Sequence, residues 1–325
     1  MIFSDRSEPP TNLRDRQGGV KNRPHPVVFL SRETDMQAQA AEQRNDPFRR
    51  IAVTPFTGTF GAEISDIDLT RIDDETTAEI RAALLRYGAI FFQGQSFTPE
   101  TQVAFARRFG TLNRHPYVKP MDGHPDVFRI VKEPTDKHHF GNGWHTDLAY
   151  TETPALGTVL YGVEVPQAGG DTMFCSQYAA YDALTGGMKS LIADLKVVYT
   201  NAHTYGKDAN RFKAGVSKAM NVTAAEVKEV VHPLVRTHPE TGCKSLYLSP
   251  VHFSRFEDMT PEQSKPLFDT LVAHATQPEF TCRFRWHNGS VAMWDNRCTM
   301  HYAIDDLSGV TRIMQRVTLE GDRPY

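Results

Sequence analysis

The stretch FTCRFRWHNGSVAMWDNRCTMHYAI, residues 280–304, decides the fold class of this 325-residue chain. It consists largely of short aromatic and apolar runs, a pattern typical of buried and half-buried β-strands. The pattern also occupies much of the chain from residue 144 onward, in segments 155–165, 170–176, 195–200, 230–239, 244–249 and 310–321. Strands at such short intervals predict a mainly β protein with appended helices (α+β), built on a sandwich or barrel rather than on βαβ units.

Four helices are predicted, in segments 73–88, 98–110, 179–195 and 260–277. The first ends at Gly88, and the apolar run 89–92 that follows predicts a buried strand. The second has Thr98 as a suitable N-cap and Pro99 at the first helical position. Two helices are therefore expected before the strand-rich half of the chain, and two are expected between its strands.

The composition divides the chain into a tail and one large domain. Residues 1–49 are polar, poor in aromatic residues and without periodicity, which predicts a flexible N-terminal tail. Residues 50–325 are predicted to fold as a single domain, because the chain is 40% hydrophobic and 10% aromatic, enough for a sizeable core.

Charge and cysteine usage exclude several classes of function. A net charge of −3 and a pI near 6.5 give no general attraction to nucleic acid or to an anionic membrane. There is neither a long apolar run nor a secretory signal, so the protein is predicted to be cytoplasmic, and a homo-oligomer is left open. The four cysteines form no C-x-x-C pair, which argues against a zinc ribbon or a disulfide framework.

The segment GNGWHTDLAY, residues 141–150, carries the first candidate metal ligands. In an extended strand residues i and i+2 point to the same face, so His145 and Asp147 can address one ion. His301 is the candidate third ligand, because it ends an apolar run just past the polar break WDNR. Two histidines and one carboxylate around open positions suit iron(II), whereas zinc with the same ligands would activate water.

Two arginines follow the candidate third ligand. In the segment 310–321 Arg312, Met314 and Arg316 share one face of a predicted strand. Buried arginines beside a metal are costly without anions, and guanidinium matches carboxylates and sulfonates by its fork geometry. Two bound anions are therefore expected.

Taken together, these motifs resemble the taurine dioxygenase family of iron(II)/2-oxoglutarate oxygenases, the TauD/TfdA type. The resemblance covers roughly residues 50–325 and rests on W-H-T-D at 144–147, G-G-D-T at 169–172, H-P-L-V-R-T-H-P at 232–239, W-D-N-R at 294–297, His301 and R-x-x-x-R at 312–316. It implies a double-stranded β-helix (jelly roll) of the clavaminate synthase-like kind, with His145, Asp147 and His301 as the catalytic metal triad.

The resemblance also implies roles for residues around that triad. Thr172 and Arg312 would bind 2-oxoglutarate, with Arg312 on the distal carboxylate. His115 and Arg316 would bind the anionic head of the primary substrate. The expected activity is that of a dioxygenase in sulfur metabolism, which takes Fe(2+), 2-oxoglutarate and O2 and releases succinate and CO2.

The substrate expected first is taurine or a similar alkylsulfonate, whose hydroxylated product would collapse to sulfite and an aldehyde. Alkyl sulfates and aryloxyalkanoates are alternatives, because Tyr117 lies one residue closer to His115 than the corresponding tyrosine of sulfonate-specific members, and segment 199–230 departs most from the taurine enzymes. Two other classes of function remain as rivals: a zinc hydrolase using the same triad, and a jelly-roll binding protein without turnover.

Overall fold

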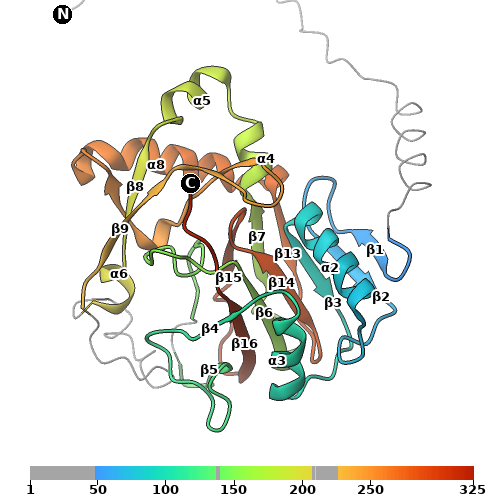
Figure 1. Cartoon of the computed structure of the whole chain (residues 1–325). Helices are drawn as coiled ribbons and strands as arrows, with labels where there is room; N and C mark the ends of the chain where they lie inside the picture. Colours follow the sequence, from blue (N-terminus) through green and yellow to red (C-terminus); the bar gives the residue numbers. More distant parts are fainter. Residues whose placement is uncertain (1–47, 137–139, 207–208, 210–225) are drawn as a thin grey trace, which may run out of the picture. The chain divides into compact units, whose positions relative to one another are not determined.

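The structure is a computed structural model that describes residues 48–136, 140–206, 209 and 226–325 (Figure 1). No helix in these ranges is long and apolar enough to cross a membrane. Phe48 is buried in the core, and the backbone N–H of Arg49 donates to the carboxylate of Glu79 at 3.0 Å. Phe48 and Arg49 of the predicted tail are therefore attached to the core, and the remainder of that tail, residues 1–47, lies outside the described residues.

One large sheet forms the centre of the folded part. Its strands are β1 (Ala52–Pro55), β2 (Ala62–Ser65), β3 (Ala89–Phe92), β4 (Leu112–Asn113), β5 (Phe128–Lys132), β6 (Gly157–Glu164), β14 (Val291–Asp295) and β16 (Arg312–Leu319). Their order is β1-β2-β3-β14-β6-β16-β4, with β5 also paired to β16. Most of these pairs are antiparallel, while β2 and β3 run parallel. The strand-rich composition of the second half thus builds the sheet's middle.

Three smaller sheets accompany it. One has the order β13 (Thr281–Phe284), β7 (Thr172–Ser176), β15 (Thr299–Ala303); a second β12 (Phe253–Phe256), β8 (Lys196–Thr200), β9 (Glu229–Pro233); and a third pairs β10 (Val235–Thr237) with β11 (Lys244–Leu246). The fold is therefore mostly sheet.

The helices begin and end at residues that favour those positions. They are α2 (Asp74–Tyr87), α3 (Pro99–Arg107), α4 (Gln177–Asp182), α5 (Gly186–Ile192), α6 (Ala202–Tyr205) and α8 (Pro261–Ala275), with 3-10 turns η2 (Pro250–His252) and η3 (Pro278–Phe280). Thr98 caps α3 and Thr260 caps α8, each in a reciprocal capping box. Gly88 ends α2 with a φ of 71°, and its N–H donates to Leu84 O.

Aromatic side chains join the sheet that contains β7 to the large sheet. Phe91 of β3 stacks on Phe284 of β13 with ring centroids 4.3 Å apart. The ring centroids of Phe174 on β7 and Trp294 on β14 lie 5.4 Å apart. All four belong to one buried apolar cluster, so the two sheets face each other across a continuous core. Helices α2 and α3 contribute to a second cluster with other residues of the large sheet.

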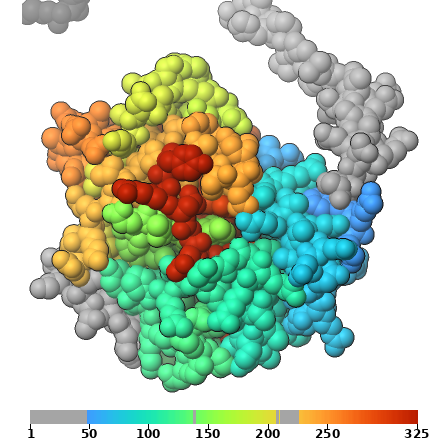
Figure 2. All heavy atoms as spheres, viewed as in Figure 1, coloured from blue at the N-terminus to red at the C-terminus, as the bar shows by residue number. Residues whose placement is uncertain are grey.

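The C-terminal residues lie at the molecular surface, in red in Figure 2. The backbone N–H of Thr237 in β10 donates to Tyr325 O at 2.7 Å, and buried Arg236 pairs with Asp322. The last residues of the chain are thereby attached to β10.

The prediction of one helix over 179–195 was wrong. The segment contains two short helices, because Thr185 begins a new one by accepting a hydrogen bond from Met188 N. Two consecutive glycines, Gly186 and Gly187, follow at that point and disfavour a continuous helix.

Candidate metal and co-substrate site

The three predicted metal ligands lie together in the structure. Nε2 of His145 lies 3.7 Å and Nε2 of His301 lies 3.6 Å from Oδ1 of Asp147. Ligand atoms of the three residues all lie within 4.8 Å of one another, and all three residues are buried. The group is therefore compact enough to hold one metal ion.

Backbone pairing brings the two histidines side by side. His145 N donates to His301 O at 3.0 Å, and His301 N donates to His145 O at 2.9 Å. His301 lies on β15, but His145 lies in a loop that makes only this isolated bridge, not in the extended strand that was predicted. The chain then turns at Leu148, whose φ of 54° is a left-handed conformation uncommon for a non-glycine residue. Such backbone strain is frequent at functional sites.

A side chain of the WDNR turn, residues 294–297, forms a hydrogen bond with the backbone of Asp147. Asn296 Oδ1 accepts hydrogen bonds from Asp147 N at 3.3 Å and from Trp294 Nε1 at 3.0 Å. The turn was predicted as a polar break, yet Asn296 is fully buried. Its polar side chain connects β14 to the candidate metal ligand.

The protonation states suit metal binding. His145 Nδ1 lies 2.7 Å from Gly143 O, and an N–H at Nδ1 that donates there makes Nε2, which faces Asp147 Oδ1, the nitrogen suited to bind a metal. Burial lowers the pKa of His301 well below its usual value, with His145 adding to the effect. Burial alone would raise the pKa of Asp147, but Arg316 and the two histidines outweigh it and lower that pKa. Neutral imidazoles and an ionised carboxylate are the forms that ligate metals.

The donor set fits the metal that the motifs predict. Two imidazole nitrogens and one carboxylate oxygen converge, and no cysteine belongs to the group. Such a facial set with open positions is characteristic of non-haem iron(II) sites, where co-substrate and dioxygen complete the coordination.

Thr172 and Arg312 lie on neighbouring parts of this core. The Arg312 guanidinium is buried, donates from Nη2 to Gly170 O at 3.1 Å, and lies 5.8 Å from the Trp286 ring centroid. Trp286 Nε1 donates to Thr172 Oγ1 at 2.9 Å. Burial lowers the pKa of Arg312 to about 10, which still leaves the guanidinium charged at neutral pH. Trp286 was not singled out in the sequence, and it contacts both predicted co-substrate residues.

The G-G-D-T motif has a steric explanation at Gly170. Its φ is 71°, and a Cβ there would lie 2.8 Å from Leu307 and 3.1 Å from Arg312 Nε. Only glycine lets the backbone approach the guanidinium this closely.

Arg316 contacts the candidate triad directly. Its Nη2 lies 2.5 Å from Asp147 Oδ2 and donates to Thr158 Oγ1 at 2.9 Å. The guanidinium carbon lies 5.5 Å from the Phe128 ring centroid and 5.8 Å from that of Trp294. The predicted substrate arginine and a predicted metal ligand thus form a buried ion pair.

His115 lies near this pair. Its Nε2 is 3.2 Å from the hydroxyl of Tyr205, its Nδ1 accepts from Tyr117 N at 3.1 Å, and its ring centroid lies 5.8 Å from that of Phe128. Burial, together with the charge of Arg316, lowers the pKa of His115 to about 3. His115 is therefore neutral at physiological pH.

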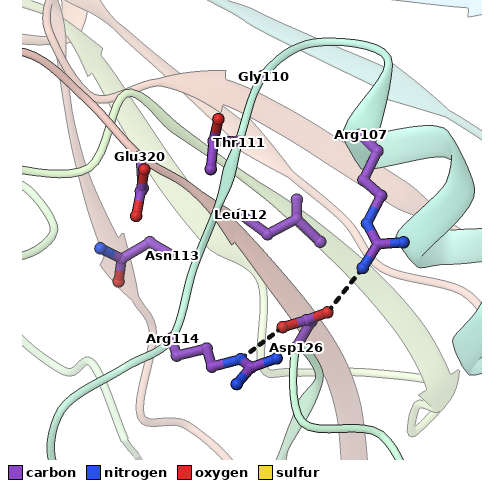
Figure 3. A pocket seen from close by; sticks show the side chains of 8 residues that line it. All are labelled: Arg107, Gly110, Thr111, Leu112, Asn113, Arg114, Asp126 and Glu320. Atoms are coloured by element: carbon purple, nitrogen blue, oxygen red, sulfur yellow. Dashed lines mark hydrogen bonds and ion pairs between the residues drawn. The ribbon is translucent and has the colours of Figure 1, made fainter.

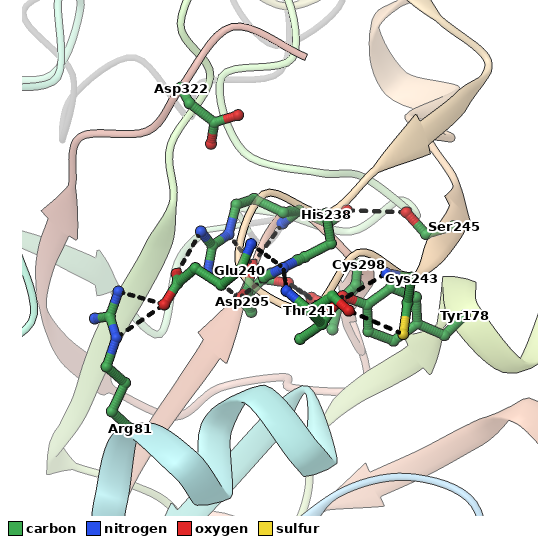
Figure 4. A network of polar contacts seen from close by, with 12 residues as sticks. Arg81, Tyr178, His238, Glu240, Thr241, Cys243, Ser245, Asp295, Cys298 and Asp322 are labelled. Carbon is green, nitrogen blue, oxygen red and sulfur yellow. Dashed lines mark hydrogen bonds and ion pairs between the residues drawn. The ribbon is translucent and has the colours of Figure 1, made fainter. Parts of the chain in front are cut away.

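A polar cluster behind the WDNR turn was not predicted. Buried Asp295 accepts from Arg297 Nη2 at 2.6 Å and from His238 Nε2 at 3.1 Å. Glu240 joins it by pairing with Arg297 at 2.8 Å and with Arg81 of α2 at 2.7 Å (Figure 4). The H-P-L-V-R-T-H-P and W-D-N-R motifs therefore meet in space, and the cluster holds the turn from which β15 carries His301.

An open pocket of about 830 Å³ lies elsewhere, beside β4 (Figure 3). Its two arginines, Arg107 and Arg114, both bind Asp126, at 3.0 and 2.7 Å. Because that carboxylate already engages both guanidinium groups, and no predicted site residue lines the pocket, the triad rather than this pocket is the candidate active site.

A mostly-sheet fold that buries a His–Asp–His group beside an arginine-rich core defines a class of metal-dependent oxygenase. Residues 52–318 match the family model described as taurine catabolism dioxygenase TauD, TfdA family. The chain belongs to this family. It is an iron(II)- and 2-oxoglutarate-dependent dioxygenase, an oxidoreductase.

Individual relatives cover most of the chain. It is 36% identical to an alpha-ketoglutarate-dependent sulfate ester dioxygenase of Pseudomonas putida, over 84% of this chain and 91% of that protein. It is 33% identical to an (S)-phenoxypropionate/alpha-ketoglutarate-dioxygenase of Sphingobium herbicidovorans, over 83% and 95%. A crystal structure of a putative alpha-ketoglutarate-dependent taurine dioxygenase from Burkholderia xenovorans matches with a TM-score of 0.72 and 37% identity, over 84% and 94%.

Proposed function

We propose that residues 50–325 form one catalytic domain that oxidises a small organic anion at a C–H bond. The core of this domain would be a double-stranded β-helix of the clavaminate synthase-like kind. The packing of the sheet containing β7 on the large sheet supports this topology, because both sheets contribute to one apolar cluster.

In this proposal His145, Asp147 and His301 hold the iron. The observation that carries the proposal is the convergence of their ligand atoms within 4.8 Å in the core. Iron(II) bound with 2-oxoglutarate supplies the oxidising power of the reaction when dioxygen is present, with release of succinate and CO2. The buried surroundings of the three ligands keep bulk water away from this chemistry.

Thr172 and Arg312 would hold 2-oxoglutarate. Arg312 is a buried cation, and a carboxylate is the partner that its fork geometry matches. Because Thr172 Oγ1 accepts from Trp286, its own hydroxyl proton is available to donate to a co-substrate oxygen. The two residues would thus fix the orientation of the co-substrate.

Arg316 and His115 would bind the anionic head of the primary substrate. Neutral His115 can donate a hydrogen bond without adding charge, because its pKa is lowered to about 3. Arg316 supplies the positive charge close to the triad. This arrangement would place the anion, and the carbon next to it, beside the metal.

A pocket of about 230 Å³ supports a substrate with an apolar body. The apolar part of its lining consists of Phe128, Val118, Pro120, Pro125 and Val127 beside His115, and Asn113, Arg114 and Asp126 line its polar part. Phe128 also lies against the Arg316 guanidinium. In this proposal an alkyl or aryl group of the anion lies in the pocket beside His115 and Phe128, and the head of the anion contacts Arg316.

The substrate class that fits these features is an alkylsulfonate or alkyl sulfate, with an aryloxyalkanoate as the alternative. Hydroxylation at the carbon that bears the leaving group gives an unstable product. A sulfonate would collapse to an aldehyde and sulfite, a sulfate ester to an aldehyde and sulfate, and an aryl ether to a carbonyl compound and a phenol. The relatives named for sulfate esters and for phenoxypropionate support this range.

Substrate-dependent succinate formation over a panel of taurine, longer alkylsulfonates, alkyl sulfates and phenoxyalkanoates tests the proposal. We expect turnover of anions with an apolar body in preference to taurine. The same panel is then measured with Val118→Phe, a variant that narrows the pocket of about 230 Å³. This variant should reduce turnover of the bulkier anions more than turnover of the smallest anion. Turnover restricted to uncharged or cationic compounds would contradict the role given to Arg316.

A further inference from the structure

The two oxygens of the Asp147 carboxylate face different partners. Oδ1 lies between the imidazole groups, 3.7 Å from His145 Nε2 and 3.6 Å from His301 Nε2. Oδ2 accepts from Thr158 Oγ1 at 3.0 Å and lies 2.5 Å from Arg316 Nη2. Oδ1 is therefore the oxygen presented to the metal, and Oδ2 is held by the protein.

Arg316, Thr158 and Asp147 form a closed set of contacts. Arg316 Nη2 donates to the Thr158 hydroxyl at 2.9 Å, and that hydroxyl donates to Asp147 Oδ2. Arg316 Nε donates to Thr318 Oγ1 at 3.3 Å. The two threonine hydroxyl oxygens accept from the guanidinium and hold it beside the carboxylate, so we infer that the orientation of Asp147 depends on Arg316.

The guanidinium has donors left for a second partner. An arginine has five N–H groups, and the contacts above use Nε and Nη2. Within the described part of the chain, no hydrogen bond or ion pair involves Nη1. The anion of a substrate can therefore bind at Nη1 without breaking the contact with Asp147.

We propose that Arg316 has a second role as a positioning residue for the metal: through Nη2 it holds the outer oxygen of Asp147 so that the other oxygen faces the ion. Outer contacts of this kind orient ligands, and losing one typically lowers metal affinity about 10- to 100-fold. This inference rests on the proposed function, because it takes Asp147 as a metal ligand.

Simple electrostatics predicts the opposite effect, which makes the inference testable. Arg316 is a buried positive charge beside a site for a divalent cation, so removing it relieves repulsion and should strengthen metal binding. Positioning predicts instead that removing it weakens metal binding. The sign of the change separates the two explanations.

The experiment measures Mn(II) binding to the full chain, with no co-substrate and no organic anion, by calorimetry or by electron paramagnetic resonance of the free ion. We expect Arg316→Met to lower the affinity about 10-fold or more, and Arg316→Lys to recover part of the loss because an ammonium group can still reach Oδ2. Thr158→Val should also lower the affinity, since it removes the second donor to that oxygen.

Arg312→Met is the matched control. It removes another buried arginine of β16, one that donates to Gly170 O instead, so Mn(II) affinity should stay the same or rise. Circular dichroism and thermal unfolding confirm that each variant is folded. Unchanged or stronger Mn(II) binding by folded Arg316→Met would overturn the inference while leaving the proposed function intact. The proposed function fails separately if His145→Ala binds Mn(II) as tightly as the parent.

Discussion

The indole N–H of Trp286 donates a 2.9 Å hydrogen bond to the hydroxyl oxygen of Thr172. The same indole lies 5.8 Å from the guanidinium carbon of Arg312. One buried tryptophan therefore contacts both residues that we propose for 2-oxoglutarate binding.

Trp286→Phe should weaken 2-oxoglutarate binding while leaving the metal in place. The change removes the donor that orients the Thr172 hydroxyl but keeps an aromatic ring beneath Arg312. A net hydrogen bond contributes about 0.5–1.5 kcal/mol, so we expect roughly a 2- to 10-fold loss of affinity. Anaerobic titration with 2-oxoglutarate measures it, and parental affinity in the variant would show that the hydrogen bond has no part in co-substrate binding.

Arg312→Ala should lower the affinity for 2-oxoglutarate much more than Arg316→Ala does. Loss of Arg312 would leave the distal carboxylate of 2-oxoglutarate buried without its partner, at a cost of about 2 to 5 kcal/mol. Loss of Arg316 should change 2-oxoglutarate affinity far less once the site is saturated with metal. Both are measured by anaerobic titration at saturating Mn(II), and equal losses would mean that the two arginines are misassigned.

Arg297→Met should destabilise the fold. It leaves buried Asp295 without the guanidinium that donates to it at 2.6 Å, and breaking a buried pair costs about 3 to 5 kcal/mol. Urea unfolding at neutral pH measures the loss. A surface control is Lys265→Met, which breaks an exposed pair with Asp269 and should cost less than about 1 kcal/mol. Equal effects of the two variants would show that the Asp295 cluster is not important for stability.

The protein should lose stability in mild acid, and His115 should contribute. Its pKa is lowered from 6.5 to about 3 by burial, so between these values the unfolded chain binds a proton that the folded chain does not. Stability therefore rises with pH across this window and falls as pH drops below about 6, by up to roughly 1.4 kcal/mol per pH unit for one such group. Denaturant unfolding at pH 7 and pH 5 should show a smaller difference for His115→Gln than for the parent. An equal difference would mean that His115 does not contribute.

Much of the fold could be predicted from local sequence. Gly88 ends α2, Thr98 and Pro99 begin α3, and the apolar run 89–92 forms β3, because capping, proline geometry and continuous apolarity act within a few residues. The break at Thr185 was missed, although Gly186 and Gly187 follow it directly and disfavour a continuous helix.

The sequence indicated that His145, Asp147 and His301 lie together, as the structure shows, but it did not indicate which residues hold them in place. His145 and Asp147 stood out by their spacing, although they lie in a loop and not in a strand. The contacts of Trp286, Thr158 and Asn296 with the site were not anticipated. Trp286 and Thr158 carry no motif, and the W-D-N-R motif that contains Asn296 does not indicate which residue its side chain contacts. Their roles depend on how the two facing sheets pack.

The central claim is that the His145, Asp147 and His301 group binds iron(II) and that 2-oxoglutarate completes the site. Anaerobic addition of iron(II) and then 2-oxoglutarate, followed by visible absorption, tests it most directly. We expect a charge-transfer band that needs both additions, is lost in His145→Ala, Asp147→Ala and His301→Ala, and appears at higher 2-oxoglutarate concentration in Arg312→Ala. No band in the parent, together with tight zinc binding and oxygen-independent hydrolysis, would contradict the claim.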